Sequence, residues 1–355
     1  MKIGIVTQPL SCNYGGILQT YALQEKLRSL GHDPITFLYN RHTWFWWIKN
    51  SILVTMLKML GKRVEYYPSP SKVRSNNRGF RKFISEHISC SKEFSSYKSS
   101  LCAGLDAIVV GSDQVWRPMY NKYSLPDMFL RFTHTSQITR LSYAASLGTD
   151  RWEFSPEQTK VCSTLLSKFN AVSVREDSGV SLCEQYLNYP NAHHVLDPTL
   201  LLSRSHYLSL CKNVPVSSSS FIFVYLLDRT PEKTKFINEI AKNKNLSVLF
   251  LSADEKVKST DTIEGWLSMF RDAKYVITDS FHGTVFSIIF HRDFNVFCNQ
   301  SRGNARIDSL LKLFALENRL ITDNVNLECI DWTSVDDVLN VNKEKSIRFL
   351  QSNLV

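Results

Sequence analysis

Short apolar segments alternate with longer segments of helical spacing along most of this chain. The short segments are rich in β-branched residues and predict strands. Residues 15–30 form the clearest helix, because Leu18, Tyr21 and Leu27 share one face and Gly31 ends it. The strands expected in the first part of the chain are 2–7, 33–38, 106–110, 141–145, 171–174 and 194–196.

The alternation pauses between residues 197 and 220, where prolines and a run of serines interrupt it, and then resumes. This pattern predicts an α/β fold with two doubly wound parallel sheets facing a cleft. We expect an N-terminal domain over residues 1–205, a C-terminal domain over 215–330 and a terminal helix over 331–355. In the second domain we expect strands 221–227, 247–251, 275–278 and 293–297, and helices 231–243, 262–272, 283–290 and 302–316.

Residues 44–63 break this rhythm with three tryptophans, a wide apolar face and only basic charges. Such a helix suits the interface of a membrane or could cover a lipid-linked acceptor. It could equally be an inserted helix that packs on the first domain.

Composition narrows the function classes. The chain has 355 residues, 42 basic against 33 acidic, and a formal net charge of +9. This excess could serve nucleic acid, an anionic membrane face or anionic substrates, or be a merely solvated surface. No nucleic-acid-binding signature appears, so we expect no nucleic-acid partner. The first residues resemble a strand rather than a signal peptide, and no apolar run is long enough to span a membrane, so we expect a cytoplasmic protein.

The segment 273–290 carries the most specific chemistry. Residues 275–278 predict a buried strand and 284–290 an apolar helix, so Ser280, Phe281, His282 and Gly283 lie on the turn between them. In a parallel sheet this turn is where ligands bind. The helix N-terminus favours an anion such as phosphate or carboxylate, and a histidine there can also transfer a proton.

Three other turns follow predicted strands. Asn13, Tyr14, Gly15 and Gly16 open a helix, where the glycines allow close approach of a ligand or simply form a capped turn. Asp113 could orient a sugar hydroxyl, take its proton, or cap the next helix.

Arg175 ends a further strand, and its planar fork suits a carboxylate or phosphate. The alternative is a surface pair with a neighbouring acidic residue. His193 and His194 point to opposite faces of a strand, and no C-x-x-C pair occurs, so we expect no metal site.

Taken in order, six segments resemble the polysaccharide pyruvyl transferase family. They are NYGGILQ at 13–19, VGSDQVW at 110–116, SYAAS at 142–146, VRED at 174–177, LDPT at 196–199 and TDSFHG at 278–283. The resemblance implies two Rossmann-like domains, as in GT-B glycosyltransferases. It also implies phosphoenolpyruvate as donor, a sugar of a cell-surface glycan, often lipid-linked, as acceptor, and no cofactor.

The resemblance makes Arg175 the donor-binding arginine and His282 the histidine at the donor site. Many members have an arginine two residues before that histidine. Here the position is Ser280, so a second cation must come from elsewhere, with Arg302 and Arg306 as candidates.

Our hypothesis is that His282 supplies or relays a proton in a cationic pocket built from both domains. Arg175 and residues 280–283 would hold the donor, while Asp113 and residues 13–16 would face the acceptor. One alternative is a glycosyltransferase of the same architecture that uses a nucleotide sugar. Another is a membrane-surface scaffold without catalytic activity.

Overall fold

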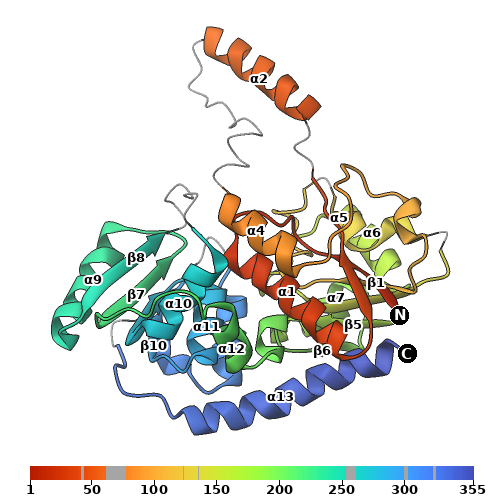
Figure 1. Ribbon diagram of the computed structural model, residues 1–355. Coiled ribbons are helices and arrows are strands. Elements are labelled where there is room, and N and C mark those ends of the chain that lie inside the picture. The colour runs from red at the N-terminus through yellow and green to blue at the C-terminus, as the bar shows by residue number, and fades with distance from the viewer. Residues whose placement is uncertain are drawn as a thin grey trace.

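The structure, a computed structural model, describes residues 1–40, 44–60, 77–122, 124–134, 136–252, 261–299, 303–322 and 325–355. Its strands form two parallel sheets, each flanked by helices (Figure 1). The six-stranded sheet has the order β2-β1-β3-β4-β5-β6, and the four-stranded sheet has the order β10-β9-β7-β8. We call the parts built on them the six-stranded half and the four-stranded half. The expected α/β class with parallel sheets is confirmed.

Strand positions follow the apolar segments of the sequence closely. The largest difference is at β6, which lies two residues before the expected strand because the N–H of Leu196 donates to Ser346 of the last helix instead of joining the sheet. The strands are β1 (Lys2–Val6), β2 (Asp33–Thr36), β3 (Ala107–Val110), β4 (Thr139–Ala145), β5 (Ala171–Val174), β6 (Ala192–His194), β7 (Phe221–Leu226), β8 (Ser247–Ser252), β9 (Tyr275–Thr278) and β10 (Phe294–Val296).

The helices connect these strands and cover the sheets. Several begin at side-chain caps, for example Thr230 and Thr262, which accept hydrogen bonds from backbone N–H groups three residues later. The α-helices are α1 (Tyr14–Ser29), α2 (Trp44–Met59), α4 (Arg78–His87), α5 (Leu125–Met128), α6 (Pro156–Leu166), α7 (Asp177–Leu187), α8 (Arg204–Leu210), α9 (Pro231–Lys244), α10 (Ile263–Asp272), α11 (Phe281–Ile289), α12 (Ala305–Leu313) and α13 (Trp332–Asn353).

The two halves share one hydrophobic core where α1, α4 and α10 meet. Tyr14 of α1 stacks on Trp266 of α10, with ring centroids 5.2 Å apart, and lies 4.8 Å from the ring of Phe80 in α4. All three side chains are buried. This contact fixes the N-terminus of α1 against the four-stranded half.

The last helix, α13, runs beneath both halves (Figure 1). At its start, Trp332 stacks on His291 of the four-stranded half, and Asp336 pairs with the same imidazole at 3.0 Å. At its end, Ser346 accepts the hydrogen bond from Leu196 of the six-stranded half, and Phe349 packs near Tyr143. The predicted terminal helix therefore bridges the two halves.

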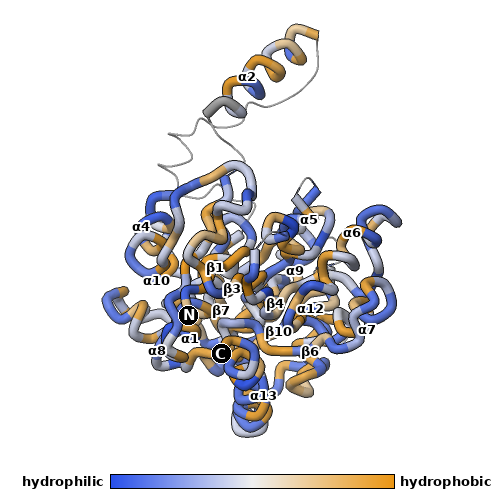
Figure 2. The backbone as a smooth tube through the Cα atoms, turned by 90° about the vertical axis from the view of Figure 1, so that its right-hand side faces the viewer, coloured by the Kyte–Doolittle hydropathy of each residue, from blue (hydrophilic) through white to orange (hydrophobic). Residues whose placement is uncertain are grey.

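Helix α2 stands away from the rest of the molecule (Figures 1 and 2). Its aliphatic residues Ile52, Leu53 and Met56 are exposed. This stripe faces solvent and does not pack on the first domain, although Val54 of the same helix is buried. No helix in the described parts of the chain is long and apolar enough to cross a membrane.

Candidate active site

The turn between β9 and α11 is shorter than the sequence predicts, because α11 begins at Phe281 and not at residue 283. Ser280 caps α11, with its Oγ accepting a hydrogen bond from the N–H of Gly283 at 3.3 Å. A Cβ on Gly283 would lie 2.2 Å from Oγ1 of Thr278, so only glycine lets the helix start this close to the strand. The turn places His282 in the first turn of α11, where it is buried.

His282 meets the other half of the molecule at Gly15. A Cβ on Gly15 would lie 2.0 Å from Nδ1 of His282, so the imidazole fills the space in front of this glycine. Asn13 caps α1 by accepting a hydrogen bond from the N–H of Gly16 at 3.1 Å, which fixes the first turn of the helix. The N-terminal turns of α1 and α11 are thus in direct contact.

Arg175 lies at the end of β5 and is buried between two carboxylates. Its Nη1 donates to Oδ2 of Asp197 at 2.9 Å, and its Nη2 donates to Oδ1 of Asp113 at 3.3 Å. The alternative of a surface pair with a sequence neighbour is wrong. Asp113 caps no helix, because the next helix in the described chain, α5, begins only at Leu125.

Asp197 is the site residue that we did not assign from the sequence, although it belongs to the LDPT segment. Its Oδ1 accepts hydrogen bonds from the N–H and Oγ1 of Thr199, at 3.0 and 2.7 Å, which hold its own turn. Its Oδ2 faces the cluster, 3.3 Å from Oγ of Ser112 and 3.7 Å from Nε2 of His282. Asp197 is therefore the carboxylate that joins Arg175 to His282. Its position after a short strand was the available signal.

Two guanidinium groups lie over the ring of Phe281. The Cζ atom of Arg175 is 4.5 Å from the ring centroid, and that of Arg306 is 5.8 Å away. Burial, together with the charge of Arg175, lowers the pKa of Arg306 to about 10. Arg306 is thus brought to the site as a second cation, as the sequence suggested. Arg302 lies outside the described residues.

Three buried carboxylates accompany the two arginines. Besides Asp113 and Asp197, Glu176 is buried, and its Oε1 accepts hydrogen bonds from the N–H groups of Leu147 and Gly148 at 2.6 and 2.9 Å. The cluster is therefore close to electrical balance and not the cationic pocket that we expected. The reason is that Asp113, Arg175, Glu176 and Asp197 all follow strands of the same sheet and meet at its carboxyl edge.

The charges in the cluster keep Asp113 and Asp197 in the ionised form. Burial alone would raise the pKa of Asp113, but the charges of Arg175, His282 and Arg306 outweigh it and lower the pKa below its ordinary value. Burial also opposes ionisation of Asp197, yet His282 and Arg175 together lower its pKa strongly. Asp113 is consequently a weak base, better suited to orient a hydroxyl than to remove its proton.

The other residues predicted around α1 lie at the edge of this cluster. Asn13 is exposed, while Tyr14 is buried among aromatic rings, and burial raises the pKa of Tyr14 well above its ordinary value. Gly16 lies against the Asn13 side chain. Within the segment 13–16, Gly15 meets the charged cluster at the His282 imidazole.

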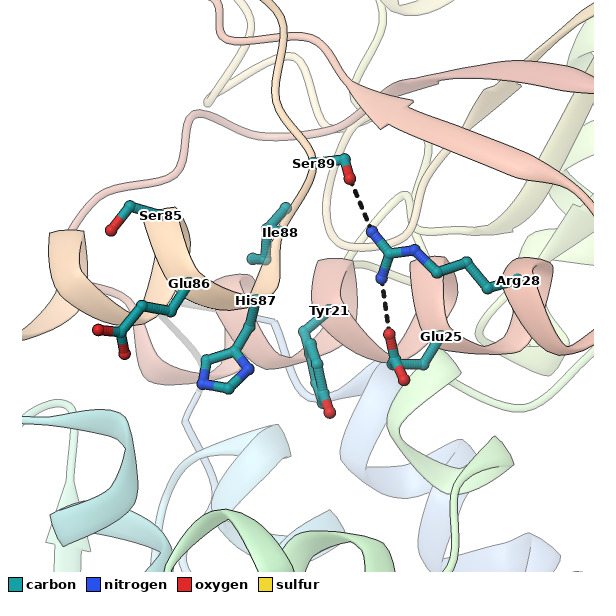
Figure 3. A pocket seen from close by; sticks show the side chains of 8 residues that line it. All are labelled: Tyr21, Glu25, Arg28, Ser85, Glu86, His87, Ile88 and Ser89. Carbon is teal, nitrogen blue, oxygen red and sulfur yellow. Dashed lines mark hydrogen bonds and ion pairs between the residues drawn. The ribbon is translucent and has the colours of Figure 1, made fainter.

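A surface pocket of about 400 Å³ lies further along α1, between this helix and α4 (Figure 3). Its lining includes Tyr21, Glu25, Arg28 and His87. Arg28 is held there by Glu25 at 2.6 Å and by Ser89 at 2.8 Å. None of the predicted site residues lines this pocket, so it is distinct from the cluster around His282.

The two histidines of β6 make structural contacts within the protein. Nε2 of His194 lies 3.1 Å from the carbonyl oxygen of Arg175, whereas the ring of His193 packs near Phe349 of α13. Within the described ranges, no three His, Cys, Asp or Glu side chains are grouped so as to hold a metal ion.

A protein-family model matches residues 13–299 of this chain. The model describes polysaccharide pyruvyl transferases. This chain belongs to that family. All six sequence segments that carried the resemblance lie within the matched range or begin it. A comparison with curated proteins finds no match.

Solved structures similar to this member of the family are enzymes of nucleotide sugars and glycosyltransferases. The UDP-GlcNAc 2-epimerase of Neisseria meningitidis bound to UDP-GlcNAc has a TM-score of 0.50 at 10% identity, covering 100% of this chain and 99% of its own. The E. coli heptosyltransferase WaaC with ADP has a TM-score of 0.40 at 11% identity, covering 99% and 100%. An α-glucosyltransferase in complex with UDP has a TM-score of 0.44 at 9% identity, covering 99% and 96%. The likeness shows the GT-B fold and nothing more.

Proposed function

We propose that this protein transfers a pyruvyl group from phosphoenolpyruvate to a sugar of a cell-surface polysaccharide or of its lipid-linked precursor. The product is a pyruvate ketal, and phosphate is released. Membership of the family supports the reaction class. The observation that carries the donor assignment is that Arg175, Arg306 and His282 surround Phe281 at the N-terminus of α11.

The donor is a small, strongly anionic molecule, and the site offers it several favourable contacts. Arginine forks bind carboxylate and phosphate groups through paired hydrogen bonds, and a helix N-terminus adds partial positive charge. Nε of Arg175 and Nε2 of His282 are buried without a hydrogen-bond partner among the described residues. Such buried donors cost free energy unless a ligand satisfies them. We assign Arg175, Arg306 and residues 280–283 to donor binding.

His282 is suited to supply the proton that starts the reaction. Protonation of the methylene carbon of phosphoenolpyruvate forms a methyl group and leaves the neighbouring carbon cationic. One sugar hydroxyl adds to that carbon and loses its proton, and a second hydroxyl then displaces phosphate with loss of its own proton. The carboxylate of Asp197 lies 3.7 Å from Nε2 and faces the imidazole from the six-stranded half.

The acceptor would approach from the six-stranded half, which we assign as the acceptor domain, residues 1–205. Asp113, ionised at the carboxyl edge of the sheet, and Asn13, exposed at the start of α1, are positioned to orient hydroxyl groups. Residues 215–330 form the proposed donor domain. The cytoplasmic location and the lipid link of the acceptor stay predictions.

The decisive experiment is incubation of the protein with phosphoenolpyruvate and candidate acceptor glycans, followed by mass spectrometry. We expect the mass increment of a pyruvate ketal together with release of phosphate, and neither with the His282→Ala variant. Calorimetry with phosphoenolpyruvate and a panel of nucleotide sugars provides the second test. Binding of a nucleotide sugar without binding of phosphoenolpyruvate would favour the alternative glycosyltransferase reaction.

A further inference from the structure

The excess charge of this protein is concentrated in one segment. Residues 34–85 contain ten lysines and arginines but one acidic residue, Glu65. The whole chain has 42 basic and 33 acidic residues, so the remainder holds 32 of each and is neutral. The formal charge of +9 therefore comes from this segment, which includes α2 and the start of α4.

Within this segment, α2 exposes a continuous aliphatic stripe. Ile52, Leu53, Met56, Met59 and Leu60 follow helical spacing along one face. Their exposed fractions are 54, 54, 58, 81 and 75%. Five large apolar side chains this exposed on one face mark a surface that binds something apolar.

Exposed basic residues occur both on α2 and on α4. Lys49 and Lys58 are exposed on α2 itself. On α4, Arg78, Arg81 and Lys82 are exposed at one-turn spacing, while Phe80 on the opposite face is buried. Figure 2 shows α2 beyond the body, on the side where α4 lies. The apolar stripe and the basic groups thus occur together on one end of the molecule.

We propose that α2 binds an anionic lipid surface. The stripe would enter the boundary between headgroups and acyl chains, and the lysines and arginines would contact anionic headgroups. A nucleic acid would fit less well, because its phosphates would face aliphatic side chains instead of cations. The proposal does not depend on the proposed reaction. It places the N-terminus of α1, which packs on α4 through Tyr14 and Phe80, near the lipid.

The test is flotation of the full-length protein with vesicles of phosphatidylglycerol and phosphatidylethanolamine, compared with vesicles of phosphatidylcholine alone. We expect the protein to float with the anionic vesicles and bind less as salt screens the headgroups. The triple variant Ile52→Gln, Leu53→Gln, Met56→Gln should lose binding more than tenfold. The matched control, Val216→Gln with Val341→Gln, removes exposed apolar residues elsewhere and should bind normally.

A second variant tests the charges. Lys49→Gln with Lys58→Gln should weaken binding to anionic vesicles about 25-fold, because each lysine near such a surface contributes roughly fivefold. Binding to phosphatidylcholine should not change. All variants should keep the wild-type thermal midpoint and the wild-type turnover of a soluble acceptor.

Three results would overturn the proposal. The first is no flotation of the wild-type protein with either vesicle. The second is a dimer, seen by light scattering, that the triple variant dissociates while no vesicle binds, which would make α2 a self-association helix. The third is binding of a labelled RNA or single-stranded DNA that the lysine variant loses, without vesicle binding.

Discussion

Asp279 of the four-stranded half and Asp197 of the six-stranded half are both buried beside a sheet, but they have different partners. Asp279 is satisfied within the four-stranded half, where it accepts from the N–H of Leu227 at 2.6 Å and pairs with Lys233 at 2.6 Å. Asp197 also pairs with a cation of its own half, Arg175, but its Oδ2 lies 3.7 Å from His282 across the boundary. Asp279 thus stabilises the four-stranded half alone, whereas Asp197 also contacts a residue of the opposite half.

We propose that this difference separates a structural ion pair, Asp279 with Lys233, from one that serves the reaction, Asp197 with Arg175. Buried ion pairs do not in themselves indicate activity, because the cost of desolvation offsets much of their attraction. The pair at Asp197 differs because its cation also faces Phe281 and because its carboxylate contacts the imidazole.

Replacement of His282 should have the largest effect. If the imidazole donates the proton, His282→Ala should lower kcat by about 10²–10⁴-fold, the usual contribution of general acid catalysis. Donor affinity measured by calorimetry should change far less. His291→Ala, which removes a histidine paired with Asp336 outside the site, serves as the control. Turnover near the wild-type level would remove His282 from the mechanism.

A larger side chain at position 15 tests the contact between Gly15 of the six-stranded half and His282 of the four-stranded half. The Cβ of Gly15→Ala would lie 2.0 Å from Nδ1 of His282 and must displace the ring, whereas that of Gly16→Ala meets the side chain of Asn13 at 3.0 Å and not the imidazole. Because a displacement of about 1 Å can cost about 10²-fold in rate, Gly15→Ala should approach that loss. Gly16→Ala should remain within a few-fold of wild type. Equal activities of the two variants would contradict the close contact.

Replacing each of the two carboxylates by an amide tests directly whether Asp197 and Asp279 have different roles. Asp197→Asn should lower kcat by about 10–100-fold, corresponding to the roughly 1.5–3 kcal/mol of a charged hydrogen bond. Asp279→Asn should leave kcat nearly unchanged and lower the free energy of unfolding by a similar amount. Steady-state kinetics and urea unfolding of both variants provide the measurements. A loss of activity in Asp279→Asn alone would reverse our assignment of the two pairs.

Acid should destabilise the protein through Asp113 and Asp197. Both have a pKa below the ordinary carboxyl value in the folded state, so the unfolded chain binds more protons as the pH falls. Their stabilisation is complete above about pH 4 and is lost as the pH falls below that value. Urea midpoints across this range should fall less steeply for Asp197→Asn than for wild type. If the urea midpoints of wild type and Asp197→Asn fell in parallel with pH, Asp197 would not contribute to the loss of stability in acid.

The sequence was sufficient for elements that depend on local patterns. The turn at 280–283 was predictable because a buried strand, a serine cap and a glycine stand next to one another. Arg175 was recognisable because a long polar side chain ends a strand of four buried residues. These features are encoded within a few residues and need no knowledge of the rest of the chain.

Features that depend on distant segments could not be predicted in the same way. Asp197 resembled a turn residue, and only the folded chain shows that its Oδ2 lies near Arg175 and His282. The glycine at position 15 suggested space for a ligand, but its neighbour is an imidazole from residue 282. The sequence also left open whether α2 packs on the protein or on a lipid surface, because its apolar face fits both.

The bridging position of α13 limits how the two halves can move. One end is anchored at His291 and the other at Leu196, so the helix acts as a strut of 22 residues across the boundary. A motion that admits substrate must therefore be a rotation around this strut or must release one of its anchors. Truncation at the C-terminus would then alter domain motion although it removes no residue near His282.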